Sequence, residues 1–489
     1  MLIWSGHMSI WSMIFTAIII LNTIGAIITV FKEKRDVAAT WAWLLTLNLL
    51  PVAGFIIYLF IGKKMSKENI YDMRTQKSLG MSQLAKVQIE MLEDEDLAQG
   101  LVETDYAQKT AILFLESDES ILTKGNKLEI FKTGEGVFDA LVQDIYKAED
   151  HVHMLYYTFR SDELGKRILA ALEDRAAAGV EVLVVYDAMG CRGNDPRFFK
   201  NLEKLGGRTE VFFGSKIPFV NLRMNYRNHR KIMVVDAKVA YLGGFNIGDE
   251  YLGKGELGEW RDTHMKIEGN AVLTLQSRFF MDWNAVAKPK NRKDYAEAYF
   301  PIADKKGDTA MQIVASGPDD EDQTIKMGFL KMISQAKESI YIQTPYFIPD
   351  ESLHEMLKIA ALSGVSVKIM IPSKPDHPFV YRATEYFSKD IIEYGAEVYM
   401  YQNGFLHSKV MVVDDEIVSL GTANMDVRSF KLNFEINAFI YDREVAAELI
   451  ANFEEDQEKC IRATHDYFAK QSKGRKFKQA FSRLLSPIL

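Results

Sequence analysis

Two histidines in this chain each stand two residues before a lysine, at the start of an apolar run. His229 and Lys231 open one run, and His407 and Lys409 open another. Side chains two residues apart on a strand point to the same side, so each imidazole would share its space with an ammonium group. An ammonium group repels metal cations and attracts anions such as phosphate. The residue types therefore predict phosphate chemistry and argue against a metal site.

The two runs are copies of one pattern. The shared positions are His229, Lys231, Asp236, Gly243 and Asn246 in the first copy and His407, Lys409, Asp414, Gly421 and Asn424 in the second. A single H-x-K match would be explained as a solvated strand edge, because short motifs match freely. Five identities at equal offsets exclude that explanation. We expect the two lysines to act as positive charges, and Asn246 and Asn424 as neutral donors, toward phosphate oxygens.

A phosphodiester held between two histidines can be cleaved in two displacements, without a metal or cofactor. One neutral ring attacks phosphorus and forms a phosphohistidine; the other, protonated, donates to the leaving oxygen and then deprotonates the incoming nucleophile. The two rings then need different surroundings. Asp262 and Glu435 follow the motifs at similar distances and are the candidates for orienting the rings, with ordinary surface acids as the alternative.

The chain repeats one order of expected elements around the motifs. Strand, capped amphipathic helix and buried strand are expected at 151–159, 161–179 and 180–187, and again at 339–347, 349–364 and 365–371. Continuous Val and Ile runs suit a sheet covered on both faces. The fold class predicted is α/β, with two similar β-α-β sandwich halves packed face to face, so that His229 meets His407.

At 489 residues the chain is long enough for two or three domains. The predicted divisions are 1–62, a transmembrane hairpin; 63–110, a polar, solvated helical connector; 111–300 and 301–470, the two halves; and 471–489, a basic amphipathic tail. We expect the tail to lie on an anionic lipid surface, with a frayed terminus as the alternative.

The hairpin prediction depends on two runs without charged residues, 10–31 and 37–61. Each is long enough to span a bilayer as a helix, with Pro51 kinking the second; buried helices of a soluble core are the alternative. Basic residues are more numerous after the second run than in the loop, which favours a cell-membrane protein with a cytoplasmic catalytic part. Cys191 and Cys460 are expected to be free thiols.

The duplicated H-x-K-x-x-x-x-D with G-x-x-N resembles the phospholipase D superfamily. The whole chain is similar to the bacterial cardiolipin synthase family within it, most clearly in the stretches 41–63, 156–168, 225–254 and 259–269. The resemblance implies that two phosphatidylglycerol molecules react to give cardiolipin and glycerol. It implies His229 as nucleophile and His407 as acid and base, although the near symmetry of the motifs leaves the reverse assignment open. Asp236 and Asp414 are expected to support the catalytic set.

Several other activities would use the same residues. A phospholipase D hydrolase would release phosphatidic acid, and a phosphatidylserine-type synthase would need a nucleotide-activated donor. A membrane-tethered nuclease is disfavoured by the net charge of −8, so no nucleic acid partner is expected. A non-catalytic scaffold would leave both motifs unexplained. The expected partners are phosphatidylglycerol and the membrane, and the sequence leaves the oligomeric state open.

Overall fold

The computed structural model describes residues 10–32, 37–62, 71, 80–98, 100–214, 225–320 and 322–487. The chain forms two compact units, residues 1–66 with 213–226, and residues 67–212 with 227–489. Most of the basic residues on which the predicted membrane orientation depends, in 33–36 and 63–79, lie outside the described residues.

The first unit is helical. It contains α1 (Ile10–Lys32), α2 (Val37–Leu49), α3 (Pro51–Ile57) and a π-helical turn (Tyr58–Gly62). The second apolar run is broken before Pro51, where a bend was predicted, because proline donates no backbone hydrogen bond. Asn22 Nδ2 donates to the Leu47 carbonyl oxygen at 2.6 Å and ties α1 to α2. Within the described ranges, no helix combines the length and apolarity needed to cross a membrane.

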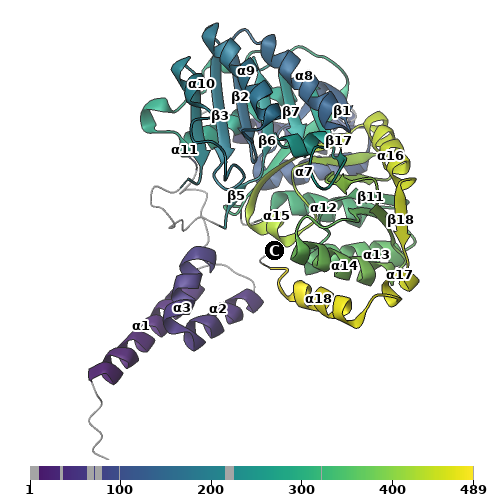
Figure 1. Cartoon of the computed structure of the whole chain (residues 1–489). Coiled ribbons are helices and arrows are strands. Elements are labelled where there is room, and N and C mark those ends of the chain that lie inside the picture. Colours follow the sequence, from purple (N-terminus) through teal and green to yellow (C-terminus); the bar gives the residue numbers. More distant parts are fainter. Residues whose placement is uncertain are drawn as a thin grey trace, which may run out of the picture. The chain divides into compact units, whose positions relative to one another are not determined.

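The second unit is built on one long mixed sheet with a repeated strand order (Figure 1). From its centre outward, the first half contributes β1 (Leu122–Phe131), β9 (His264–Glu268), β7 (Val239–Gly243), β6 (Lys231–Val235), β2 (His151–Tyr156), β3 (Glu181–Asp187) and β4 (Arg208–Phe212). The second half contributes β10 (Thr309–Ser316), β17 (Asn433–Tyr441), β16 (Ile417–Gly421), β15 (Val410–Val413), β11 (Ser339–Gln343), β12 (Ser366–Pro372), β13 (Glu397–Tyr401) and β18 (Cys460–Ala463). The predicted duplication is therefore present in the order of the strands.

The two halves join edge to edge. Strands β1 and β10 pair antiparallel, with Leu122 opposite Gln312 and Asn126 opposite Thr309. The predicted face-to-face packing of the two halves is wrong in this respect, because their strands form one continuous sheet. The physical reason is that β1 and β10 would otherwise be edge strands with unpaired backbone groups, and their pairing satisfies those groups.

Helices cover both faces of the sheet, as the continuous apolar strands require. They are α8 (Gly134–Tyr146), α9 (Glu163–Ala177), α10 (Lys200–Lys204) and α11 (Ala271–Val286) in the first half, and α12 (Thr324–Gln335), α13 (Glu351–Leu362), α14 (Pro378–Ile392) and α16 (Arg443–Gln457) in the second. The predicted caps of α9 and α13 are confirmed: Asp162 accepts from the Gly165 N–H and Asp350 from the Leu353 N–H.

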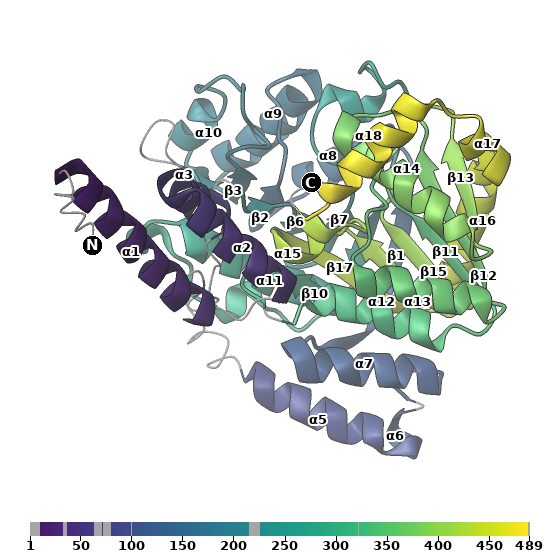
Figure 2. The ribbon, with the colours of Figure 1, turned by 90° about the horizontal axis from the view of Figure 1, so that it is seen from below.

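The segment before the first half is helical, as expected, but it is not solvated. It forms α5 (Met81–Glu93), α6 (Glu95–Ala98) and α7 (Asp105–Asp118); α7 packs against α12, and α5 packs against α7 (Figure 2). Leu92 and Phe114 are fully buried in the core of the second half, and the Phe114 ring lies 4.3 Å from that of Phe439. The predicted solvated connector is thus corrected: sparse apolar residues on one helix face are enough to dock it.

Candidate active site

Each H-x-K motif is held in place by a strand of the opposite half. Short strand β5 (Arg227–Asn228) leads into His229 and pairs parallel with the start of β17. Short strand β14 (Phe405–Leu406) leads into His407 and pairs parallel with β8 (Trp260–Arg261). The His229 N–H donates to the Phe434 carbonyl oxygen at 2.9 Å, and the His407 N–H donates to the Arg261 carbonyl oxygen at 2.7 Å. The backbone therefore fixes both histidines at the junction of the halves.

The two predicted carboxylates contact the histidines in a crossed arrangement. Nδ1 of His229 lies 3.0 Å from both carboxylate oxygens of Glu435, and Nδ1 of His407 lies 2.6 Å from Oδ2 of Asp262. Both carboxylates are fully buried. A carboxylate only accepts, so each Nδ1 carries the proton and donates it to an acid from the other half. No hydrogen bond engages Nε2 of either ring within the described residues, which leaves those atoms available to react.

Sheet register shows why these two acids are equivalent. Gly243 pairs with His264 in the first half, and Gly421 pairs with Asn437 in the second. The residues two positions before His264 and Asn437 are the two acids, so they hold corresponding places. Their offsets from the motifs differ because the intervening loops differ in length, so the sequence shows the two acids at similar and not identical distances from the motifs.

The two acids have different supports, and the sequence did not predict them. Thr422 Oγ1 donates to Glu435 Oε2 at 2.6 Å, and Asn433 Nδ2 donates to Oε1 at 3.1 Å. At the position corresponding to Thr422 the first half has Gly244, where a Cβ atom would overlap Oδ1 of Asp262. The only signal in the sequence was that Thr422 and Gly244 each directly follow the glycine of their motif.

The two motif lysines are buried beside the histidines. Lys231 Nζ donates to the His229 carbonyl oxygen at 2.5 Å, and Lys409 Nζ donates to the His407 carbonyl oxygen. Burial lowers the pKa of Lys231 to about 7, and the charge of Lys409 adds to this lowering, whereas Glu435 opposes it. Burial likewise lowers the pKa of Lys409 to about 8, against Asp262 and Glu435. Two such ammonium groups at one site favour a bound anion.

The surroundings of both histidines favour the neutral ring. Burial lowers the pKa of His407 to about 4, with Lys409 adding to the effect and Asp262 opposing it. Burial also lowers the pKa of His229, with Glu435 opposing it and Lys231 adding to it. A neutral imidazole is the form that attacks phosphorus, and an anion bound between the rings raises the pKa of the partner ring.

The motif aspartates lie apart from this group. Asp236 accepts from the backbone N–H groups of Glu149, Asp150 and His151 at 2.8–2.9 Å, and Asp414 accepts from those of residues 337–339 at 2.7–2.9 Å. Each stands five residues beyond its lysine, about 16 Å along an extended strand. The structure does not bring the two aspartates to the histidines. Each one binds the backbone at the start of the adjacent strand, β2 for Asp236 and β11 for Asp414.

Comparison with known proteins agrees with this duplicated site. A family model described as "Cardiolipin synthase, PLD-like domain" matches residues 141–269 and 329–457, one match in each half. A cardiolipin synthase of Listeria welshimeri is 50% identical over 99% of this chain and 100% of its own length. The chain belongs to the cardiolipin synthase family of the phospholipase D superfamily. It is therefore a phosphatidyltransferase of that superfamily, with duplicated phospholipase D-like domains.

Other relatives extend this comparison. The major cardiolipin synthase of Bacillus subtilis is 47% identical over 99% of this chain and 100% of its own. A model described as "Phospholipase_D-nuclease N-terminal" matches residues 20–63. The crystal structure of a phosphatidylserine synthase from Haemophilus influenzae has a TM-score of 0.61 and 16% identity, over 78% of this chain and all of that one, which shows a common fold.

The two predicted phosphate-binding asparagines are buried near the ends of equivalent strands. Asn246 accepts from the Thr158 N–H at 3.2 Å and donates to the Tyr251 hydroxyl at 2.9 Å. Asn424 Oδ1 is buried and has no hydrogen-bond partner among the described residues. The phosphate contact of Asn246 and Asn424 in this phospholipase D-type site stays a prediction.

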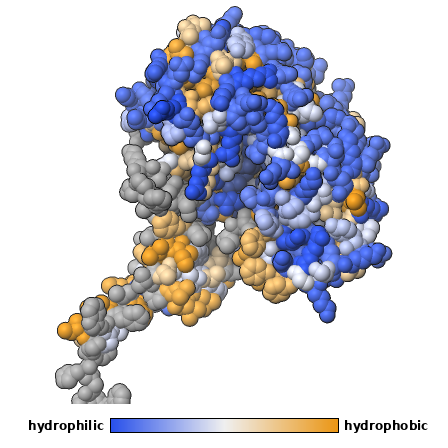
Figure 3. Space-filling view, in the orientation of Figure 1, coloured by the Kyte–Doolittle hydropathy of each residue, from blue (hydrophilic) through white to orange (hydrophobic). Residues whose placement is uncertain are grey.

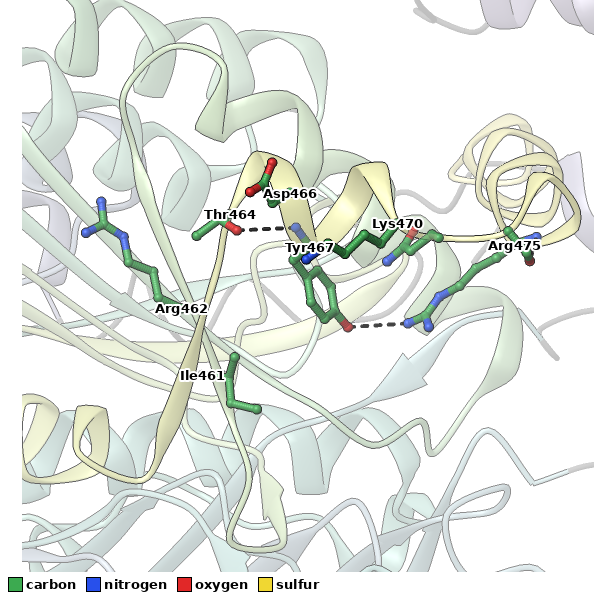
Figure 4. Close-up of a pocket in the computed structure, with 9 residues that line it drawn as sticks. Ile461, Arg462, Thr464, Asp466, Tyr467, Lys470 and Arg475 are labelled. Atoms are coloured by element: carbon green, nitrogen blue, oxygen red, sulfur yellow. Dashed lines mark hydrogen bonds between the residues drawn. The ribbon is translucent and has the colours of Figure 1, made fainter.

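One cavity of ≈ 710 Å³ lies between strand β18 and the start of the helix Lys473–Leu484 (Figure 4). It is lined by side chains from Ile461 to Arg475, and none of them belongs to the H-x-K motifs or to their carboxylates. In the described part of the chain, no group of three or more His, Cys, Asp and Glu side chains is placed to hold a metal ion.

Proposed function

We propose that this cardiolipin synthase transfers a phosphatidyl group from one phosphatidylglycerol molecule to another through a phosphohistidine. The observation that carries the proposal is the crossed pair of buried carboxylates. Each fixes the proton on Nδ1 of one histidine and leaves Nε2 of that ring as the reactive atom.

In the first displacement, Nε2 of His229 attacks phosphorus, and the bond from phosphorus to the glycerol oxygen breaks. His407, protonated once the phosphodiester is bound, donates its proton to that oxygen, and glycerol leaves. Glu435 stabilises the positive charge that develops on the attacking ring. Lys231 and Lys409 stabilise the charge on the phosphate oxygens.

In the second displacement, the now neutral His407 accepts the proton of a headgroup hydroxyl on a second phosphatidylglycerol. That oxygen attacks phosphorus, the bond from phosphorus to Nε2 of His229 breaks, and cardiolipin is formed. Two phosphatidylglycerols thus give one cardiolipin and one glycerol. If water attacked instead, the product would be phosphatidic acid.

The test is product analysis with the full-length protein, phosphatidylglycerol as the only lipid substrate, and a chelator. Equal amounts of cardiolipin and glycerol are expected, because each transfer releases one glycerol, and the chelator should have no effect because the proposed mechanism uses no metal. Phosphatidic acid in their place would assign the site to a hydrolase. His229→Ala and His407→Ala should each abolish turnover, and both variants should keep the melting temperature of the parent protein. Substantial activity in either variant would refute the two-histidine mechanism.

We further propose that residues 10–31 and 37–61 attach this family member to the cell membrane, with the catalytic unit on the cytoplasmic side. Support comes from their lack of charge and from apolar side chains that stay exposed in the first unit, such as Leu21 at 69% and Leu49 at 76%. Alkaline carbonate should leave the protein in the membrane pellet, and protease should reach the catalytic unit only in inverted vesicles. Release by carbonate would refute the attachment.

A further inference from the structure

The last described helix, α18 (Lys473–Leu484), is an amphipathic helix packed with its polar side inward. Gln479 and Ser482 are 3% and 1% exposed, whereas Phe477, Phe481 and Leu484 are 71%, 47% and 73% exposed. These three apolar residues follow one another at four and three positions and therefore share one face. An ordinary surface helix buries its apolar face against the core, so this orientation is the reverse of the usual one.

Polar contacts with α14 hold the helix in this orientation. Glu385 on α14 is 1% exposed and accepts from Arg475 Nε at 3.1 Å and from Gln479 Nε2 at 3.2 Å. The Arg483 guanidinium lies 5.1 Å above the Tyr386 ring. Because these partners sit on the inner side of the helix, turning its apolar face inward would leave the buried carboxylate of Glu385 without them. The exposed apolar face is thus fixed by the fold.

The charges of α18 set it apart from the rest of the chain. The helix carries Lys473, Arg475, Lys476, Lys478 and Arg483 and no acidic residue, although the chain as a whole has a net charge of −8. Figure 2 shows the helix lying along α14 at the surface, and Figure 3 shows hydrophobic surface where its C-terminal end lies. A bare apolar strip bordered by lysines is the pattern of helices that lie in the interface of an anionic bilayer.

We propose that the outward face of α18 inserts its apolar side chains into an anionic lipid surface and holds the catalytic halves against it. Charge favours lipid over a protein partner, because lysines beside an apolar strip are depleted from protein interfaces and enriched at anionic headgroups. The proposal adds a second point of membrane contact, distinct from residues 10–61, and it does not depend on the histidine mechanism.

The test is a fluorescent label whose emission reports the polarity around one side chain. The full-length protein carries Cys460→Ser, so that buried Cys191 is the only native thiol, and NBD is attached at Leu484→Cys. The matched control is NBD at Leu362→Cys, since Leu362 at the end of α13 is similarly exposed at 68%. Both proteins are reconstituted in phosphatidylcholine vesicles with and without phosphatidylserine as the anionic lipid.

With phosphatidylserine present, the emission maximum of NBD at position 484 should shift to shorter wavelength. Lipids that carry a nitroxide on the acyl chain should quench about half of this emission, and the control label should show neither effect. Lys473→Gln with Lys478→Gln should weaken the quenching, and high salt should do the same. Absence of lipid quenching at position 484 would overturn the proposal. A blue shift without lipid quenching would overturn it as well, since it would show cover by protein, such as a second copy.

Discussion

The crossed carboxylates give a prediction that separates the roles of the two histidines. Glu435→Gln should disable His229, although the two residues belong to different halves, and Asp262→Asn should disable His407. Each substitution keeps the shape of the side chain and removes its charge. The Nδ1 to carboxylate distances of 3.0 and 2.6 Å show that both acids contact a ring directly.

The magnitude follows from the charges involved. An imidazolium and a carboxylate about 4 Å apart attract by about 4 kcal/mol at an effective dielectric constant of about 20. Loss of that attraction in the transition state lowers the rate about 10³-fold. Both acids are fully buried, so solvent screening does not reduce the effect. Glu448→Gln, on exposed α16 surface, serves as the control and should keep the parent rate.

The assay is the burst of p-nitrophenol from a phosphatidyl ester with that leaving group, compared with turnover of phosphatidylglycerol. Nitrophenolate leaves without a proton, so the first displacement needs the nucleophile and not the acid. Asp262→Asn should therefore keep the burst and lose phosphatidylglycerol turnover, whereas Glu435→Gln should lose both. The opposite pattern would make His407 the nucleophile. Parent activity in both variants would refute any function of the crossed contacts.

Three other perturbations test the rest of the site. The pKa values of Lys231 and Lys409 are about 7 and 8, so both side chains are charged at low pH. Above pH 7 Lys231 loses its charge, and KM for phosphatidylglycerol, measured by pH-jump kinetics, should rise about tenfold per pH unit. Asp236→Ala removes three backbone contacts and should lower the free energy of unfolding by about 3 kcal/mol in urea titrations, with kcat of the folded protein unchanged. Gly244→Ala should displace Asp262 and reduce kcat at least about tenfold without a matching loss of melting temperature; unchanged kcat would contradict that contact.

Features that depend on neighbouring residues were predictable from the sequence. The capped helix α9 ends just before Gly179, which adopts φ +92, a conformation that suits glycine. The strand carrying Lys231 is buried along its whole length, as its continuous apolar run predicted, and the break before Pro51 follows from its missing N–H. In each case the residues that decide the structure lie within a few positions of one another.

Features that depend on pairing between distant strands were not predictable. The β1–β10 junction is made by backbone hydrogen bonds, which do not depend on the side chains. The sequence of residues 122–131 therefore does not predict that they pair with residues 309–316. The crossed contacts of Asp262 and Glu435 likewise follow from the β5–β17 and β14–β8 pairings between the halves. The outward orientation of the apolar face of α18 was not predictable for another reason. An amphipathic pattern does not show which face of a helix packs against the domain.

The crossed contacts also mean that neither half holds a complete site, and this leads to a last prediction. Residues 301–308 link the halves as an irregular segment in which Ile302 is 100% exposed, so a protease site inserted there should be cut without disturbing either core. The β1–β10 pairing and the histidine contacts should hold the cut pieces together, and cardiolipin synthesis should continue at the parent rate. Separation in urea should abolish activity in both pieces, and joint refolding should restore it. Activity in one isolated half would show that a histidine works without the acid that crosses to it.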